Sequence, residues 1–249
     1  MNDQITKETP KLRPITFLAG ACLVLLCFLV FDVTIIAGYK ENEFRKSSTS
    51  TPTTFPTPHI LVQEPADKSN AIYEDFSSNK NDWGLYYPYG KLQIINGKLI
   101  LQSNPDYPFT IGISNKFNPR RPKYYLQADF STDTDSMSSF GLIFAISKSV
   151  NTFYLFEVWP RSASFHLMKF DSANWDELIP HSKAELRPYP QPNMLGVHFD
   201  NGNIQLYING DLVSTFSDIN PLQSKDVGIF TSTSGYRLIV DNFFIYYEK

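Results

Sequence analysis

The stretch MLGVHFD-NGN-IQLYI-NG-DLVSTF, residues 194–216, decides the fold. It contains three segments in which apolar and polar side chains alternate, and Asn-Gly pairs at 201–202 and 209–210 separate them. Asn and Gly tolerate positive φ at both centres of a type I′ turn, which suits the right-handed twist of paired strands. The stretch therefore predicts three antiparallel strands joined as a meander.

The same pattern continues in both directions along the chain. A third Asn-Gly pair, at 96–97, separates KLQII from KLILQ and predicts a hairpin. Further strand-like segments are YYLQADF (124–130), FGLIFAI (140–146), FYLFEVW (153–159), SFHLMKF (164–170), DVGIF (226–230) and YRLIVDNFFIYY (236–247). Because no helical periodicity interrupts them, residues 70–249 are predicted to form an all-β domain, an antiparallel two-sheet jelly-roll sandwich.

An apolar run, ITFLAGACLVLLCFLVFDVTIIAGY, occupies residues 15–39 and carries one charge, Asp32. About 20 apolar residues in a helix cross the hydrocarbon core of a bilayer. A cleaved secretory signal has a shorter apolar region of about 7–15 residues. The segment 18–22 resembles a lipoprotein signal ending in Cys22, but the residues after it stay apolar. We therefore expect one N-terminal transmembrane helix, an uncleaved signal anchor.

The flanking segments suggest the orientation of this helix. Basic residues are balanced between residues 1–14 and 40–46, so charge alone does not set it. The segment SSTSTPTTFPTP (47–58) cannot form a core and is typical of a stalk beneath an extracytoplasmic module. We expect a cytoplasmic tail at 1–14, a Ser/Thr/Pro-rich stalk at 40–69, and an extracytoplasmic domain. The lack of N-x-S/T sequons favours a prokaryotic cell membrane.

Composition argues against a disulfide-stabilised domain and against a nucleic-acid-binding protein. Both cysteines, Cys22 and Cys27, lie in the apolar run, so the β domain carries no disulfide and depends on its hydrophobic core. The formal net charge of −3 argues against a nucleic-acid partner.

The order of motifs resembles the concanavalin A-like lectin/glucanase superfamily, in its laminin G-like jelly-roll domains of the bacterial membrane-anchored type. The motifs are YEDFSSNKNDW (73–83), INGKLIL (95–101), FGLIFAISKSVNTFYLFEV (140–158), VHFDNGNIQLYINGDLV (197–213), VGIFT (227–231) and LIVDNFFIY (238–246). The resemblance implies a jelly roll shared by lectins, carbohydrate-binding modules, adhesion domains and glycoside hydrolases. Fold alone does not choose among these functions.

Two carboxylates are needed for most glycoside hydrolysis. The glucanases that the chain resembles place them on one strand as E-x-D-x-x-E, a pattern missing here. Glu157 has no partner carboxylate in its own segment. We therefore assign no catalytic residue and expect a non-catalytic module that binds a glycan or a partner protein. A hydrolase with carboxylates from separate strands and a structural or sensor module of an envelope assembly are the alternatives.

Strand alternation predicts which side chains face outward. Tyr154, Phe156 and Val158 suit the core, as do the alternate residues of 124–130, and Trp83 is also expected inside. If the outward residues of these strands share one concave sheet, a single groove would be lined by Gln127, Asp129, Glu157, Trp159, His198, Gln205 and Tyr207. Trp175 is expected to be exposed at a hairpin tip. Aromatic faces and hydrogen-bonding groups suit a sugar ring, whereas the alternative is an ordinary solvated sheet face.

Metal binding is considered at two places. His166 and His198 lack the neighbouring ligands in sequence that a zinc site needs. The resemblance implies that the first and last strands run side by side, where a structural Ca²⁺ could be held by Glu74, Asp75 and Asp241. Asp241 could equally cap a turn.

Overall fold

A computed structural model describes residues 70–86, 89–104, 106–107, 109–116, 123–135, 138–224, 226–232 and 236–248. The predicted tail, transmembrane helix and stalk lie outside these residues and stay predictions. Within them, no helix is long and apolar enough to cross a membrane.

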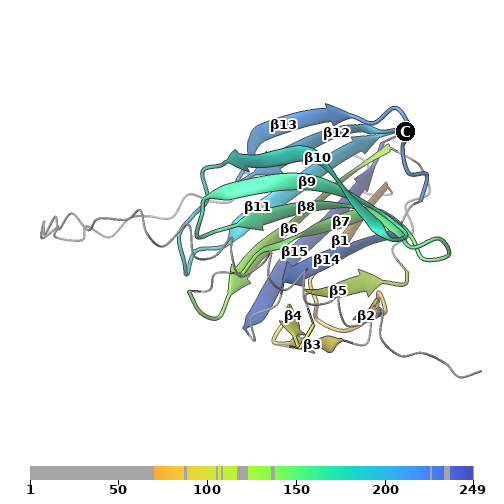
Figure 1. Cartoon of the computed structure of the whole chain (residues 1–249). Coiled ribbons are helices and arrows are strands. Elements are labelled where there is room, and N and C mark those ends of the chain that lie inside the picture. The colour runs from red at the N-terminus through yellow and green to blue at the C-terminus, as the bar shows by residue number, and fades with distance from the viewer. Residues whose placement is uncertain are drawn as a thin grey trace, which may run out of the picture. The chain divides into compact units, whose positions relative to one another are not determined.

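The described part of the chain forms two antiparallel sheets (Figure 1). The eight-stranded sheet has the order β13-β12-β11-β6-β15-β4-β3, with β1 also paired to β15. Its strands are β1 (Ala71–Glu74), β3 (Gly90–Ile95), β4 (Lys98–Ser103), β6 (Lys123–Thr132), β11 (Asn193–Asp200), β12 (Asn203–Ile208), β13 (Asp211–Ser217) and β15 (Arg237–Tyr247). The first and last strands thus run side by side, as the resemblance implied.

The seven-stranded sheet has the order β10-β9-β8-β7-β14-β5-β2. Its strands are β2 (Trp83–Leu85), β5 (Phe109–Ser114), β7 (Phe140–Ser147), β8 (Thr152–Trp159), β9 (Ser164–Asp171), β10 (Asn174–Lys183) and β14 (Asp226–Ser232). In Figure 1, β9 and β10 lie in front of β11 and β12, which belong to the other sheet. The all-β sandwich prediction is confirmed.

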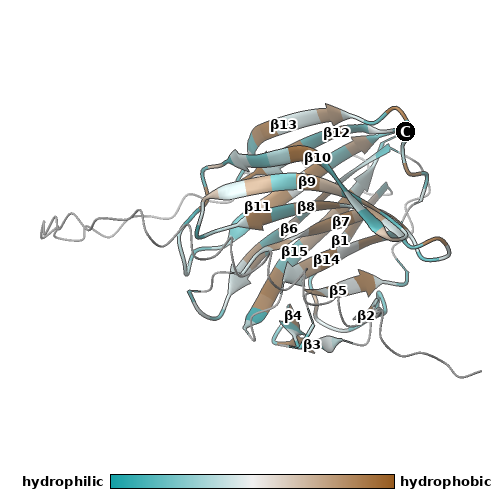
Figure 2. Ribbon diagram, viewed as in Figure 1, coloured by the Kyte–Doolittle hydropathy of each residue, from teal (hydrophilic) through white to brown (hydrophobic). Residues whose placement is uncertain are grey.

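The core lies between the sheets and follows the alternation of the strands. Tyr154, Phe156 and Val158 of β8 are fully buried, and so are the alternate residues of β6 from Tyr124 to Phe130. Trp83 is also buried, and its ring packs edge-on against Phe243. Figure 2 shows the corresponding mixture of hydrophobic and hydrophilic residues along the strands. The inward residues predicted from the sequence are therefore confirmed.

The three Asn-Gly pairs form the turns that the sequence predicts. Their φ angles are 52° and 71° at 96–97, 49° and 93° at 201–202, and 52° and 105° at 209–210. Positive values at both positions match a type I′ turn. These turns join β3 to β4, β11 to β12, and β12 to β13, whose strands pair in antiparallel register.

Strand β10 is the irregular edge of the seven-stranded sheet. Its register with β9 shifts between Glu177 and Ile179 and again between Ile179 and Ser182. Pro180 lies between the shifts and has no N–H to donate, which an edge strand tolerates. The shifts turn Ile179 inward, where it joins the core. Glu177 and His181 remain exposed on either side of it.

Candidate ligand-binding face of the seven-stranded sheet

The eight predicted ligand-binding residues divide between two sheets. Five lie on strands of the eight-stranded sheet: Gln127, Asp129, His198, Gln205 and Tyr207. Three lie on strands of the seven-stranded sheet: Glu157, Trp159 and Trp175. Because outward residues of the two sheets face away from each other, they do not line the single groove expected from the sequence. Their roles in binding remain predictions.

On the eight-stranded sheet, the polar side chains largely satisfy one another. His198 bonds Gln205 Oε1 at 3.1 Å through Nδ1 and Glu248 Oε1 at 2.9 Å through Nε2. The hydroxyl of Tyr207 also donates to Gln205 Oε1, at 2.9 Å. Gln127 is buried and accepts a hydrogen bond from Tyr125. Groups already paired in this way offer fewer free donors and acceptors to a ligand.

Asp129 lies on the same sheet, beside the strand β15. Its Oδ2 accepts a hydrogen bond from Asn242 Nδ2 at 2.8 Å. Burial raises the pKa of this carboxyl, and the nearby charge of Asp241 raises it further. Asp129 is therefore a half-buried carboxyl group whose hydrogen-bond partner, Asn242, is uncharged. Its ionised form destabilises the fold.

On the seven-stranded sheet, Glu157 anchors a buried polar cluster. Its Oε2 lies 2.8 Å from His166 Nε2, and its Oε1 accepts a hydrogen bond from the hydroxyl of Ser139. Glu157 and His166 face each other in the β8–β9 register. Glu157 is only 6% exposed. It therefore holds His166 in place rather than presenting its carboxylate to solvent.

Three groups that could ligate a metal surround the other side of His166. One ligand atom each from His166, Glu177 and His181 lies within 4.8 Å of the others. The His166 and His181 rings are 4.6 Å apart between centroids, and Trp159 contacts both rings at 4.4 Å. These residues come from three adjacent strands, β8, β9 and β10. Among the described residues, no other such group of three converges.

An apolar patch continues from this cluster along the same face. Its buried members are Ile111, Ile113, Ile143, Ile146, Phe153, Leu155 and Phe230. Trp175 packs against this patch through edge contacts with Phe109 and Phe153 and a tilted contact with Phe170. Its side chain is still 39% exposed, as expected from its place at the β9–β10 hairpin. The patch therefore presents an indole to solvent.

A cleft of about 240 Å³ lies at the end of the sandwich, where β6 ends and β7 begins. Arg161, Arg187 and Tyr189 are among its lining residues. Ser138 and Pro160 also line it, and they are chain neighbours of Ser139 and Trp159. The cleft is therefore adjacent along the chain to the polar cluster. Loops build most of it, so strand alternation gives no signal for it.

The two carboxylates of the cluster are poorly placed for glycoside hydrolysis. Glu157 lies against Nε2 of His166, and Glu177 Oε1 lies 3.8 Å from Nδ1 of the same ring. The imidazole thus occupies the space between them, where a glycosidase holds the scissile bond. Glu157 and Glu177 therefore do not face each other across an open space.

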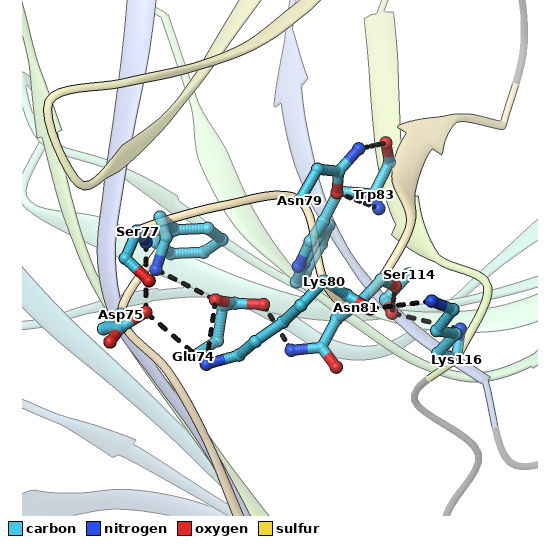
Figure 3. Close-up of polar contacts among 10 residues, drawn as sticks. Glu74, Asp75, Ser77, Asn79, Lys80, Asn81, Trp83, Ser114 and Lys116 are labelled. Carbon is cyan, nitrogen blue, oxygen red and sulfur yellow. Dashed lines mark hydrogen bonds and ion pairs between the residues drawn. The ribbon is translucent and has the colours of Figure 1, made fainter.

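The carboxylates proposed for calcium have other partners (Figure 3). Glu74 is fully buried, and its Oε1 accepts a hydrogen bond from the Phe76 backbone N–H at 2.9 Å. The Lys80 ammonium lies 4.0 Å from Glu74 and 3.5 Å from Asp75. Asp241 instead pairs with Lys98 at 3.4 Å. Among the described residues, Glu74, Asp75 and Asp241 do not converge as a group of metal ligands, and the Lys80 ammonium lies beside the first two.

Sequence reasoning missed the cluster around His166 for a physical reason. His166 lies 11 residues before Glu177 and 15 before His181, so no short motif joins them. The register shifts in β10 bring Glu177 and His181 to one side, and these shifts leave little trace in the sequence. Pro180 between them is the one local sign of an irregular strand.

No protein-family model matches the sequence, and no curated protein matches it. Solved structures do match. The carbohydrate-binding module CBM66 of Bacillus subtilis is similar with 15% identity and a TM-score of 0.55, over 68% of this chain and 97% of that one. The β-glucanase of Bacillus licheniformis has 10% identity and a TM-score of 0.56, over 72% and 99%.

The carbohydrate recognition domain of Emp47p is also similar, with 9% identity and a TM-score of 0.55 over 74% of this chain and 97% of that one. At these identities the likeness concerns the fold. The residues that the structure describes between 70 and 248 have the concanavalin A-like jelly-roll fold.

Proposed function

We propose that the chain is a membrane-anchored, extracytoplasmic, non-catalytic module that binds a glycan on the outer face of its seven-stranded sheet. The observation that carries the proposal is a pair of partly exposed tryptophans on this face, with hydrogen-bonding side chains between them. Trp159 lies opposite Ser164 and Trp175 opposite Phe170, six residues further along β9. At about 3.4 Å per residue, the backbone positions of the two tryptophans are about 20 Å apart along the strand.

A sugar chain fits such a surface for simple reasons. Aromatic rings pack against the C–H faces of pyranose or furanose rings, and short polar side chains bond the hydroxyls. Glu177 and His181 follow Trp175 along β10, and the His181 ring contacts Trp159. Both side chains are exposed. The separation of the two indoles suits an oligosaccharide that runs along the strands. The arginine-lined cleft would extend this surface at the end beyond Trp159.

The names of the similar structures support the same class of ligand. They include a carbohydrate-binding module and a carbohydrate recognition domain. The β-glucanase is a hydrolase of the same fold. We infer binding rather than hydrolysis here because the imidazole of His166 separates the two carboxylates of the cluster.

A glycan array of bacterial, fungal and plant oligosaccharides, probed with the full chain, tests the ligand class. Trp175→Ala should reduce binding at least tenfold, because it removes an exposed stacking surface that lies outside the main core between the sheets. Tyr207→Ala is the matched control, since it removes an aromatic side chain from the outer face of the other sheet. Loss of binding in Tyr207→Ala alone would move the site to the eight-stranded sheet. No binding to any glycan would favour the structural or sensor alternative.

The anchor is tested separately. If residues 15–39 span a membrane, the chain should stay in the membrane pellet after extraction with alkaline carbonate and leave it in detergent. Protease added to intact cells should then remove the β domain from the outside. Release of the full chain by carbonate would contradict the anchor without bearing on the binding face.

A further inference from the structure

We propose that His166, Glu177 and His181 form a binding site for a divalent transition metal, with Zn²⁺ as the best-suited ion. The site lies on the outer face of the seven-stranded sheet, across β9 and β10. This inference goes beyond glycan binding and does not depend on it, because it rests on the positions of the three side chains alone.

The first argument is the orientation of His166. An ionised carboxylate accepts hydrogen bonds and cannot donate one. The 2.8 Å contact between Glu157 Oε2 and His166 Nε2 therefore assigns the proton of His166 to Nε2. Ser139 holds the other oxygen of Glu157. The lone pair of a neutral His166 then lies on Nδ1. A carboxylate that fixes the second nitrogen in this way is the usual support of a metal-bound histidine.

The second argument is that Nδ1 has no partner of its own. This atom is buried and makes no hydrogen bond, and the whole side chain of His166 is only 9% exposed. Leaving a buried polar atom unpaired destabilises the fold. The nearest charged group is Glu177 Oε1, at 3.8 Å. A lone pair and a carboxylate oxygen therefore face each other at a distance too long for a hydrogen bond, and a cation between them would satisfy both.

The third ligand completes the set. A ligand atom of His181 lies within 4.8 Å of those of His166 and Glu177. Bonds of about 2.0–2.2 Å in a tetrahedral zinc site put ligand atoms about 3.4 Å apart. His166 is fixed, whereas Glu177 and His181 are exposed side chains that can rotate inward by the remaining distance.

The donor set points to the kind of metal. Two imidazoles and one carboxylate suit Zn²⁺, whereas Ca²⁺ and Mg²⁺ take oxygen ligands. Three protein ligands leave the fourth tetrahedral position for water or for an oxygen of a bound molecule. Trp159 contacts both histidine rings and shields one side of the site. The metal would also tie the irregular edge strand β10 to β9.

Isothermal titration of the metal-free full chain with ZnCl₂ tests the proposal. We expect saturable binding with one Zn²⁺ per chain that His181→Ala and Glu177→Gln each weaken at least tenfold. Both residues are exposed, so these variants should fold, and their far-UV circular dichroism should match that of the parent chain. Glu157→Gln should weaken binding about 10–100-fold, because it removes the support of His166.

His198→Ala is the matched control. His198 also lies on a sheet face and bonds a glutamate, Glu248, but it belongs to the other sheet and its second nitrogen bonds Gln205. Its replacement should leave the zinc affinity unchanged. Titration of the parent with CaCl₂ should show no comparable binding.

Three results would overturn the proposal. The first is the absence of saturable Zn²⁺ binding. The second is binding that survives both His181→Ala and Glu177→Gln, which would place it elsewhere in the chain. The third is an equal loss in His198→Ala. None of these outcomes bears on the glycan array, so the two proposals can fail separately.

Discussion

At the scale of single residues, the buried carboxylate of Glu74 makes the sharpest prediction about stability. Its oxygens accept hydrogen bonds from the Phe76 N–H and from Asn81 Nδ2, which belong to the loop between β1 and β2 (Figure 3). Glu74→Ala leaves these donors unpaired and should lower the free energy of unfolding by about 2–4 kcal/mol in urea denaturation. Asp75→Ala, at an exposed neighbour, should cost far less. Equal losses would mean that the buried contacts contribute little.

Asp129 predicts a dependence of stability on pH. Burial raises the pKa of this carboxyl in the folded state. Its ionised form therefore weakens the fold, an effect that is absent below the unfolded pKa and grows as the pH rises through the folded pKa. Asp129→Asn should thus be more stable than the parent at pH 7, and the difference should shrink towards pH 3.5. Urea denaturation at both pH values measures it. A difference that does not change with pH would contradict this account.

Side-chain direction could be predicted from the sequence for most single residues, and exposure could not. Alternation correctly puts Leu126 inside and Gln127 on the other face. Gln127 is nevertheless buried: Tyr125 of the same strand donates a hydrogen bond to it, and Phe244 of the neighbouring strand β15 lies opposite it in the register. Coverage of this kind depends on neighbours across the sheet, which one strand's pattern does not contain.

At the scale of elements, the close pairing of β7 and β8 depends on Gly141. A Cβ atom at this position would lie 2.9 Å from Glu157 Cα and closer still to the Phe156 carbonyl oxygen. Both obstacles are backbone, so the strands would have to separate. Gly141→Ala should lower the free energy of unfolding by at least about 2 kcal/mol, measured by urea denaturation. Gly84→Ala, whose nearest neighbour is the Asn115 side chain at 4.0 Å, should be close to neutral. Similar effects of the two changes would contradict the packing seen here.

Strand boundaries show what sequence pattern can and cannot give. The segments 140–146 and 153–159 correspond closely to β7 and β8. Strand β10 was not predicted, because NWDELIPHSK contains a proline and several charges and lacks a regular alternation. Its pairing with β9 is irregular for the same reason, and that irregularity brings Glu177 near His166. Two members of the proposed metal site, Glu177 and His181, therefore lie in the strand whose sequence pattern is least regular.

At the scale of the whole molecule, the order of motifs predicted the sandwich, but it did not assign strands to sheets. Segments 124–130 and 153–159 carry the same alternation, yet β6 belongs to one sheet and β8 to the other. That difference follows from long-range pairing, β6 with β11 and β15, and β8 with β7 and β9. The candidate residues consequently divide into a self-paired polar network on one face and an aromatic face on the other.

The measurement that tests the central claim most directly is a titration of the full chain with an array-selected glycan, followed by tryptophan fluorescence. Of the three tryptophans, Trp83 is buried in the core, and Trp159 and Trp175 lie on the proposed face. We predict a saturable change in emission that disappears in the double variant Trp159→Phe/Trp175→Phe and persists in Tyr207→Ala. Binding that leaves the emission unchanged, or a signal that survives in the double variant, would contradict a site on the seven-stranded sheet.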